Sequence, residues 1–136
     1  MSFTVSALSL AYSVASQVAP EGVRVETQVS ASDAHSLPLV IVGTSAPSSV
    51  LNGPNESSAA FSLSIRCYST RRAEALEICD SLYGGFVTAW RTGLSTPFGW
   101  ISRITQDSQQ PHLIQSDLEA DNVYRFDCVL DVIARH

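Results

Sequence analysis

Apolar and polar residues alternate along three stretches of this chain, and that period of two predicts half-buried strands. The stretches are residues 23–29, 59–69 and 125–132. In the second, we expect the core side to hold Phe61, Leu63, Ile65 and Cys67 and the outer side to hold Ser62, Ser64, Arg66 and Tyr68. In the third, the predicted core positions are Phe126, Cys128, Leu130 and Val132. Chain ends usually fray, so we expect a neighbouring strand or subunit to hold this closing strand.

Other stretches carry different periods. Residues 37–43, LPLVIVG, form a short continuous apolar run, which is typical of a central strand buried on both faces. Residues 98–106, FGWISRITQ, indicate a further strand. Helical spacing predicts one helix over residues 3–19, which ends at Pro20 and Gly22. The predicted core positions of that helix are Leu8, Ala11, Ala15, Val18 and Ala19.

A longer helix is predicted over residues 70–92, with Thr70 as its N-cap. Gly84 and Gly85 lie within it, each at a cost of about 1 kcal/mol relative to alanine. They indicate a kink or the close approach of another backbone. The predicted apolar stripe of this helix is Ala73, Leu76, Cys79, Leu82, Tyr83, Phe86 and Trp90.

The first turn of the longer helix contains Arg71 and Arg72, where the helix dipole disfavours cations. Two interpretations are open. The arginines are either solvated charges, or they pair with carboxylates on a neighbouring molecule, since a local penalty without a local gain often marks a partner.

Two long polar stretches are predicted as loops, at about residues 43–58 and 107–121. The first has Val50 and Leu51 at its middle, and two adjacent apolar residues in a loop suggest an anchor, either for another surface or for their own domain. The second is acidic, with Asp117, Glu119 and Asp121 near its end. Their spacing resembles a calcium loop, but the glycine and glutamate that such a loop requires are Asn122 and Cys128, so we reject an EF-hand.

The order of predicted elements is α-β-β-loop-β-α-β-loop-β within a single domain, residues 1–136. This order predicts an α+β fold: a mostly antiparallel sheet with an N-terminal helix and one long central helix packed on one face.

The charge balance narrows the classes of partner. The formal net charge is −5 and the chain contains no lysine. An acidic chain has no general attraction for DNA, RNA or anionic membranes. The three cysteines are odd in number and form no CxxC motif, so we expect neither a disulfide framework nor a zinc site, and a reducing compartment. We expect no signal peptide and no membrane span.

Catalytic signatures are missing from the sequence. The histidines are His35, His112 and His136, without the spacing of a metal site, and no GxSxG, GxGxxG or phosphate-loop motif occurs. We therefore expect no catalytic, cofactor-binding or metal-binding residues, no cofactor, and a protein that is not an enzyme.

From residue 58 onward, the order of elements resembles a known family. FSLSIRCYS leads into a helix with RRAEALEICDSL, followed by FGWISRITQ, the proline-containing QQPH and a last strand beginning YRFDCVLDV. This pattern resembles the tail terminator (tail completion) proteins of long-tailed bacteriophages. The resemblance covers roughly residues 58–136 and the N-terminal helix, and it has no sharp motif.

The resemblance implies a virion structural protein, assembled in the host cytoplasm, that forms a homo-hexameric ring at the head-proximal end of the tail. The ring ends polymerisation of the tail tube protein, joins the head–tail connector protein, and lets DNA pass through its lumen without specific binding. The alternatives are another head–tail joint protein, a stopper or adaptor, or a small cytoplasmic enzyme or ligand-binding domain. The interface residues that we predict are Val50, Leu51, Arg71, Arg72, Arg103, Asp117, Glu119 and Asp121.

Overall fold

The computed structural model describes residues 5–28, 37–49, 58–105, 107–115 and 123–136. Two helices and seven strands lie within these ranges. The helices are α1 (Ala7–Val18) and α2 (Arg72–Thr92). The strands are β1 (Arg24–Glu26), β2 (Leu39–Thr44), β3 (Ser48–Ser49), β4 (Ser58–Ser69), β5 (Trp100–Ile104), β6 (Gln109–Ile114) and β7 (Tyr124–Arg135).

Two long strands, β4 and β7, form the centre of the sheet. Each has twelve residues, and they pair antiparallel along their whole length, from Ser58 opposite Arg135 to Ser69 opposite Tyr124. Strands β2 and β3 pair with the free edge of β4, and β5 and β6 with the free edge of β7. Strand β1 pairs parallel to β2 at the outer edge. The fold is therefore α+β with a mostly antiparallel sheet, as the sequence predicts.

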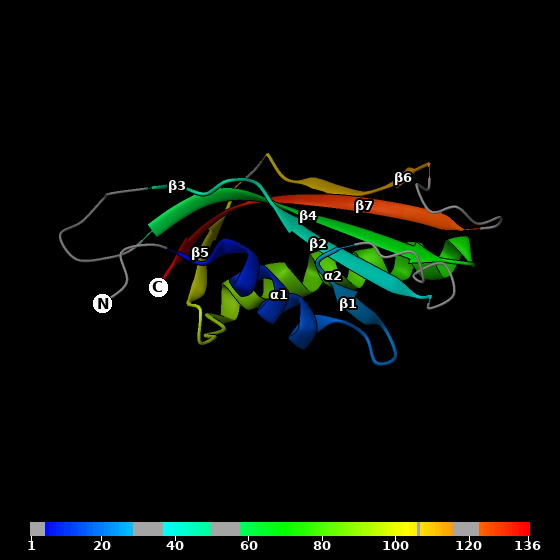
Figure 1. The fold of residues 1–136 in the computed structure, drawn as a ribbon, viewed down its shortest axis with the longest axis horizontal. Helices are drawn as coiled ribbons and strands as arrows, with labels where there is room; N and C mark the ends of the chain where they lie inside the picture. The colour runs from blue at the N-terminus through cyan, green and yellow to red at the C-terminus, as the bar shows by residue number, and fades with distance from the viewer. Residues whose placement is uncertain (1–4, 29–36, 50–57, 106, 116–122) are drawn as a thin grey trace.

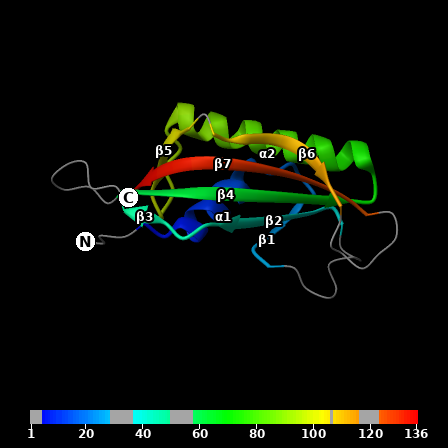
Figure 2. The ribbon, with the colours of Figure 1, turned by 90° about the horizontal axis from the view of Figure 1, so that it is seen from above.

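Both helices cover the same face of the sheet (Figure 1). Seen from above, α2 runs along the β5/β6 side and α1 lies under the β2 side (Figure 2). The helices meet where α1 ends: a Cβ atom added at Gly85 would lie 2.7 Å from the Cβ of Val18, whereas one added at Gly84 would meet nothing within 4 Å. The predicted close approach is therefore found at Gly85, but the group that approaches is the Val18 side chain rather than another backbone.

The alternation of β4 and β7 produces the main core. All eight predicted core positions of these strands are buried: Phe61, Leu63, Ile65, Cys67, Phe126, Cys128, Leu130 and Val132. The strand β2 is buried on both faces, as its continuous apolar run predicts. Val40 and Val42 join the main core, while Leu39 and Ile41 face the other way. The closing strand is held to its end by β4 and β5, which confirms the expectation of a restrained C-terminus.

One outer position of β4 differs from the prediction. Tyr68 does not face solvent but is fully buried in a second small core with Leu39 and Ile41. The guanidinium carbon of Arg125 lies 5.9 Å from the centre of the Tyr68 ring. Alternation placed Tyr68 on the correct face, but its burial depends on the neighbouring strand β2, which is apolar on both faces.

Both helices begin later than predicted, and most of their predicted core residues do pack in the main core. The exceptions are Leu8, Ala73 and Leu76. Leu8 is 43% exposed, and the buried positions of α1 are Ala7, Leu10, Ala11, Val14 and Ala15. On α2, Ala73 and Leu76 are exposed rather than buried. The buried side of α2 consists of Ala75, Ile78, Cys79, Leu82, Phe86 and Ala89, with Tyr83 and Trp90 at its margin.

Thr70 is not the N-cap of α2. The cap position is Arg71, whose side chain makes no capping bond. The buried Ser69 acts instead: its hydroxyl accepts a hydrogen bond from the Arg71 N–H at 3.2 Å and donates one to Glu74 Oε1 at 2.6 Å. Ser69 is the last residue of β4, so the strand itself supplies the polar group that the helix start needs.

One predicted strand and the two predicted loops also differ from the observed secondary structure. The strand predicted at residues 23–29 is limited to β1. The predicted loop 43–58 begins within β2 and contains β3, and the predicted loop 107–121 contains the edge strand β6. In β6 the pairing register shifts between Gln109 and His112. That irregularity removes the even alternation by which a strand is recognised in sequence.

Candidate functional site

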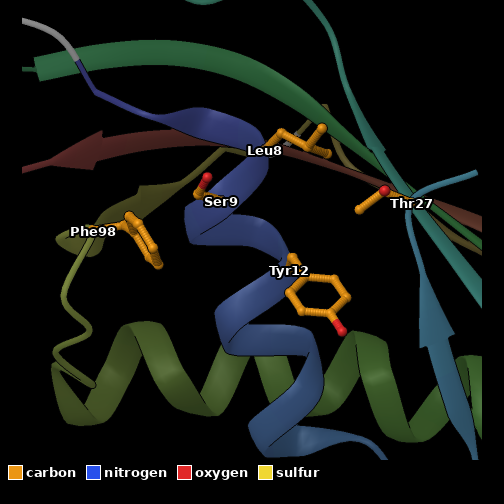
Figure 3. A pocket seen from close by; sticks show the side chains of 5 residues that line it. All are labelled: Leu8, Ser9, Tyr12, Thr27 and Phe98. Atoms are coloured by element: carbon orange, nitrogen blue, oxygen red, sulfur yellow. The ribbon is translucent and has the colours of Figure 1, made fainter.

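An apolar hollow on the outer side of α1 is a candidate contact surface. Leu8, Ser9 and Tyr12 project from α1, with Phe98 on one side and Thr27 on the other (Figure 3). The hollow, of about 420 Å³, is called the α1 groove below. Leu8, Tyr12 and Phe98 are 43%, 42% and 39% exposed. Residues 7–18 contain no charged side chain, so the exposed side of this helix is free of the charges usual on a solvated helix.

A polar row crosses the opposite face of the sheet. Ser62 Oγ on β4 donates a 2.5 Å hydrogen bond to Asp131 Oδ1 on β7. On one side, Ser45 Oγ accepts a hydrogen bond from the Ser62 N–H, and on the other, Ser108 Oγ accepts one from the Asp131 N–H. Ser45 follows β2 and Ser108 precedes β6, so the hydroxyls bind backbone groups where the outer strands are interrupted. The shallow hollow beside this row, about 380 Å³, includes Ser45, Ser62 and Asp131. Hydrogen bonds within the sheet therefore explain why this row of residues is polar.

Three buried thiols meet between the sheet and α2. Cys67 lies on β4, Cys128 on β7 and Cys79 on α2. Burial raises the pKa of the Cys67 thiol well above its usual value. The hydrogen bond with Cys79, together with burial, raises the pKa of Cys128. Within the described ranges, no group of three His, Cys, Asp or Glu side chains has a geometry that could hold a metal ion. All three cysteines are buried members of the main core, where a free thiol packs as a small apolar side chain.

The structure separates the arginines that we predict at an interface. Arg71 and Arg72 are exposed at the start of α2, beside the end of β4. Arg103 is exposed on β5 and pairs with Ile133, nine residues along β7 from Tyr124, which is about 30 Å at the rise of a strand. The three arginines are therefore not parts of one site. Val50, Leu51, Asp117, Glu119 and Asp121 lie outside the described residues.

Sequence reasoning missed the α1 groove because it assigned Leu8 to the core. One signal was present in the sequence: the lack of charge across residues 7–18. The contributions of Thr27 and Phe98 carried no signal, because residues far apart in sequence form the groove.

Comparisons with known proteins found no family model that matches the chain and no matching curated protein. In the part of the chain that the structure describes, no helix is long and apolar enough to cross a membrane.

Proposed function

We propose that this chain is a ring-forming structural subunit at the head-proximal end of a bacteriophage tail, which ends growth of the tail tube and joins it to the head connector. The observation that carries the proposal is the arrangement of elements from β4 onward. The long strand β4 leads directly into the long helix α2, and the closing strand β7 returns beside β4 over its whole length. The order of these elements along the chain is the one on which the resemblance to tail terminators rests.

The surface of the molecule supports a role in protein contact. The α1 groove combines apolar side chains with a helix face that lacks charge, and depletion of charge is the compositional mark of the centre of protein interfaces. The space between the sheet and the helices is filled by buried side chains of the main core. The hollows described here therefore lie on the surface, where a partner can reach them.

Loss of the protein during infection tests the proposal. An early stop codon in the gene, in the phage genome that carries it, should give overlong tails without heads, visible by negative-stain electron microscopy. A complementing plasmid copy is the control and should restore normal particles. Tails of normal length detached from heads would instead indicate a stopper or adaptor. Intact infectious particles would refute a structural role and favour the enzyme or ligand-binding alternative.

A further inference from the structure

The exposed large apolar side chains of the described residues lie mainly in two groups. Leu8, Tyr12 and Phe98 form the α1 groove. The second group is Leu76, Leu113 and Tyr124, which are 42%, 50% and 38% exposed. They come from α2, β6 and β7, on the far side of the helical layer from α1 (Figure 2).

The strand register places the second group on the helix-covered face of the sheet. Leu113 pairs with Phe126, which is buried in the main core, and paired residues share a face. Tyr124 precedes Phe126 by two residues and so has the same orientation. Tyr124 also pairs with Ser69, which leads into the start of α2. Leu113 and Tyr124 therefore lie at the edge of the sheet where α2 begins.

Near its start, α2 has the cation of Arg72 on one side and carboxylates on the other, while Asp80, one turn after Leu76, is exposed between the two sides. Arg72 has the same direction on the helix as Trp90, five turns later, and Leu76 follows one turn after Arg72. Trp90 Nε1 donates a hydrogen bond to the Ser102 carbonyl oxygen of β5, so this side of α2 faces the β5/β6 edge. On the other side, Glu74 and Glu77 line a hollow with Glu21, which follows α1. We name Arg72, Leu76, Leu113 and Tyr124 the α2/β6 patch.

The two edges of the helical layer therefore differ in their apolar shape and in the charges beside it. The α1 edge has an apolar groove and three carboxylates, Glu21, Glu74 and Glu77. The α2/β6 edge has protruding apolar side chains and the exposed cation of Arg72. A surface that is complementary to a different surface of the same molecule forms a head-to-tail contact, and such contacts close into rings when the rotation allows.

We propose that the α2/β6 patch of one copy of this chain packs on the α1 side of the helical layer of the next copy, with its apolar side chains on the α1 groove and Arg72 toward the carboxylates. The occupant of the groove is a second copy, because one molecule supplies both protruding apolar side chains for an apolar groove and a cation for the carboxylates. Apolar contacts provide the attraction at the centre, and Arg72 sets the register by facing the carboxylates. This inference rests on the proposed ring function, and it names the contact that builds the ring.

Disulfide cross-linking between two single-cysteine additions tests this contact. Tyr12→Cys and Leu113→Cys place one new thiol in the groove and one in the patch, while the three native cysteines stay buried. Mixing the two variants at high concentration under mild oxidation should give a 12–113 linked dimer, identified by mass spectrometry. Ser48→Cys, an exposed position on β3, is the matched control. Linkage of 12 to 12 or 113 to 113 as the main product, or no linkage above the control, would overturn the proposal.

A charge exchange provides the second test. Arg72→Glu should weaken association of the full chain about tenfold in sedimentation experiments, equivalent to about 1.4 kcal/mol. Glu77→Arg in the same chain should restore it, since the exchange recreates an opposite pair between copies. Both residues are exposed, and circular dichroism of each variant checks that the fold is retained. Equal association of Arg72→Glu and wild type would contradict the assigned register.

The two proposals fail separately. Overlong tails after the stop codon, together with no 12–113 linkage, would leave the tail function in place and refute the contact. A 12–113 linkage with intact infectious particles would keep the contact and refute the tail function.

Discussion

The two glycines of α2 differ in what a methyl group would meet. Gly85→Ala should destabilise the fold by about 1–3 kcal/mol, because its Cβ would overlap Val18 where the helices cross. Gly84→Ala should stabilise it by about 1 kcal/mol, since it gains helix propensity and meets nothing. Urea unfolding of both variants measures the difference. A stabilising Gly85→Ala would mean that the helices are farther apart than the structure has them.

Ser69, rather than Thr70, should determine the stability of the α2 start. Ser69→Ala removes the acceptor of the Arg71 N–H and the donor to Glu74, so we expect a loss of about 1–2 kcal/mol. Thr70→Ala is the matched control at the exposed neighbouring residue, and it should change stability by less than about 0.5 kcal/mol. Thermal unfolding compares the two, and the reverse order would restore Thr70 as the cap.

The raised pKa values of the Cys67 and Cys128 thiols should make the fold sensitive to alkaline pH. Burial raises the pKa of Cys67 in the folded protein above 9.0, the ordinary value that applies to this thiol in the unfolded chain. The native state therefore retains a proton that the unfolded state loses. The stabilising contribution is therefore complete below that pH and is lost as the pH rises beyond it, by about 1.4 kcal/mol per pH unit for each such thiol. Urea unfolding between pH 7 and 10 measures this slope. Cys67→Ala should flatten it, and an unchanged slope would assign the effect to other groups.

At the scale of elements, the sheet depends on its closing strand, β7. β7 is the strand that joins β4 to both β5 and β6. A stop codon that removes residues 132–136 deletes the pairs of β5 with β7 and exposes the end of β4, so we expect the protein to lose cooperative unfolding. Removal of His136 alone, which lies beyond β7 and is exposed, should have little effect. Circular dichroism melts distinguish the two truncations, and a folded longer truncation would contradict this assignment.

Periodicity located the long elements and failed on the short ones. The strands β4 and β7 were predictable because each keeps strict alternation over many residues, which fixes the face of every side chain. The strand β6 was not, because it lies at an edge, contains Pro111 and shifts register. The predicted stripe of α2 wrongly included Ala73 and Leu76, which are apolar but exposed, because apolar character alone does not show which residues a neighbouring element covers.

At the scale of the whole molecule, the acidic balance predicts weak interaction with DNA. A net charge of −5 gives no release of counterions on contact with the DNA backbone. We therefore expect no shift of duplex DNA by the purified protein at physiological salt in an electrophoretic assay. A basic protein of similar size is the positive control. Retention of DNA would require a local basic surface and would contradict passage of DNA without specific binding.

The candidate contact surface shows where sequence reasoning stopped. The exposed arginines were predicted as interface residues, but the sequence offers no reason to separate Arg72 from Arg103. Only the fold places Arg72 beside Leu76 and the β6 edge, and the carboxylates of Glu74 and Glu77 on the opposite side of the same helix. Charge identity is a property of a residue, whereas charge complementarity is a property of two surfaces.

The sequence alone determined the α+β class, the inner face of β4 and β7, and the burial of β2 on both faces, because local periodicity and apolar content dictate these features. The tertiary structure decided which glycine of α2 contacts α1, that the Ser69 hydroxyl binds the start of α2, and that Leu8 lies in a surface groove with Phe98. The physical reason is distance along the chain. Alternation is read between near neighbours, while a helix crossing or a groove depends on how separate elements pack, and packing is settled by shape across the whole core.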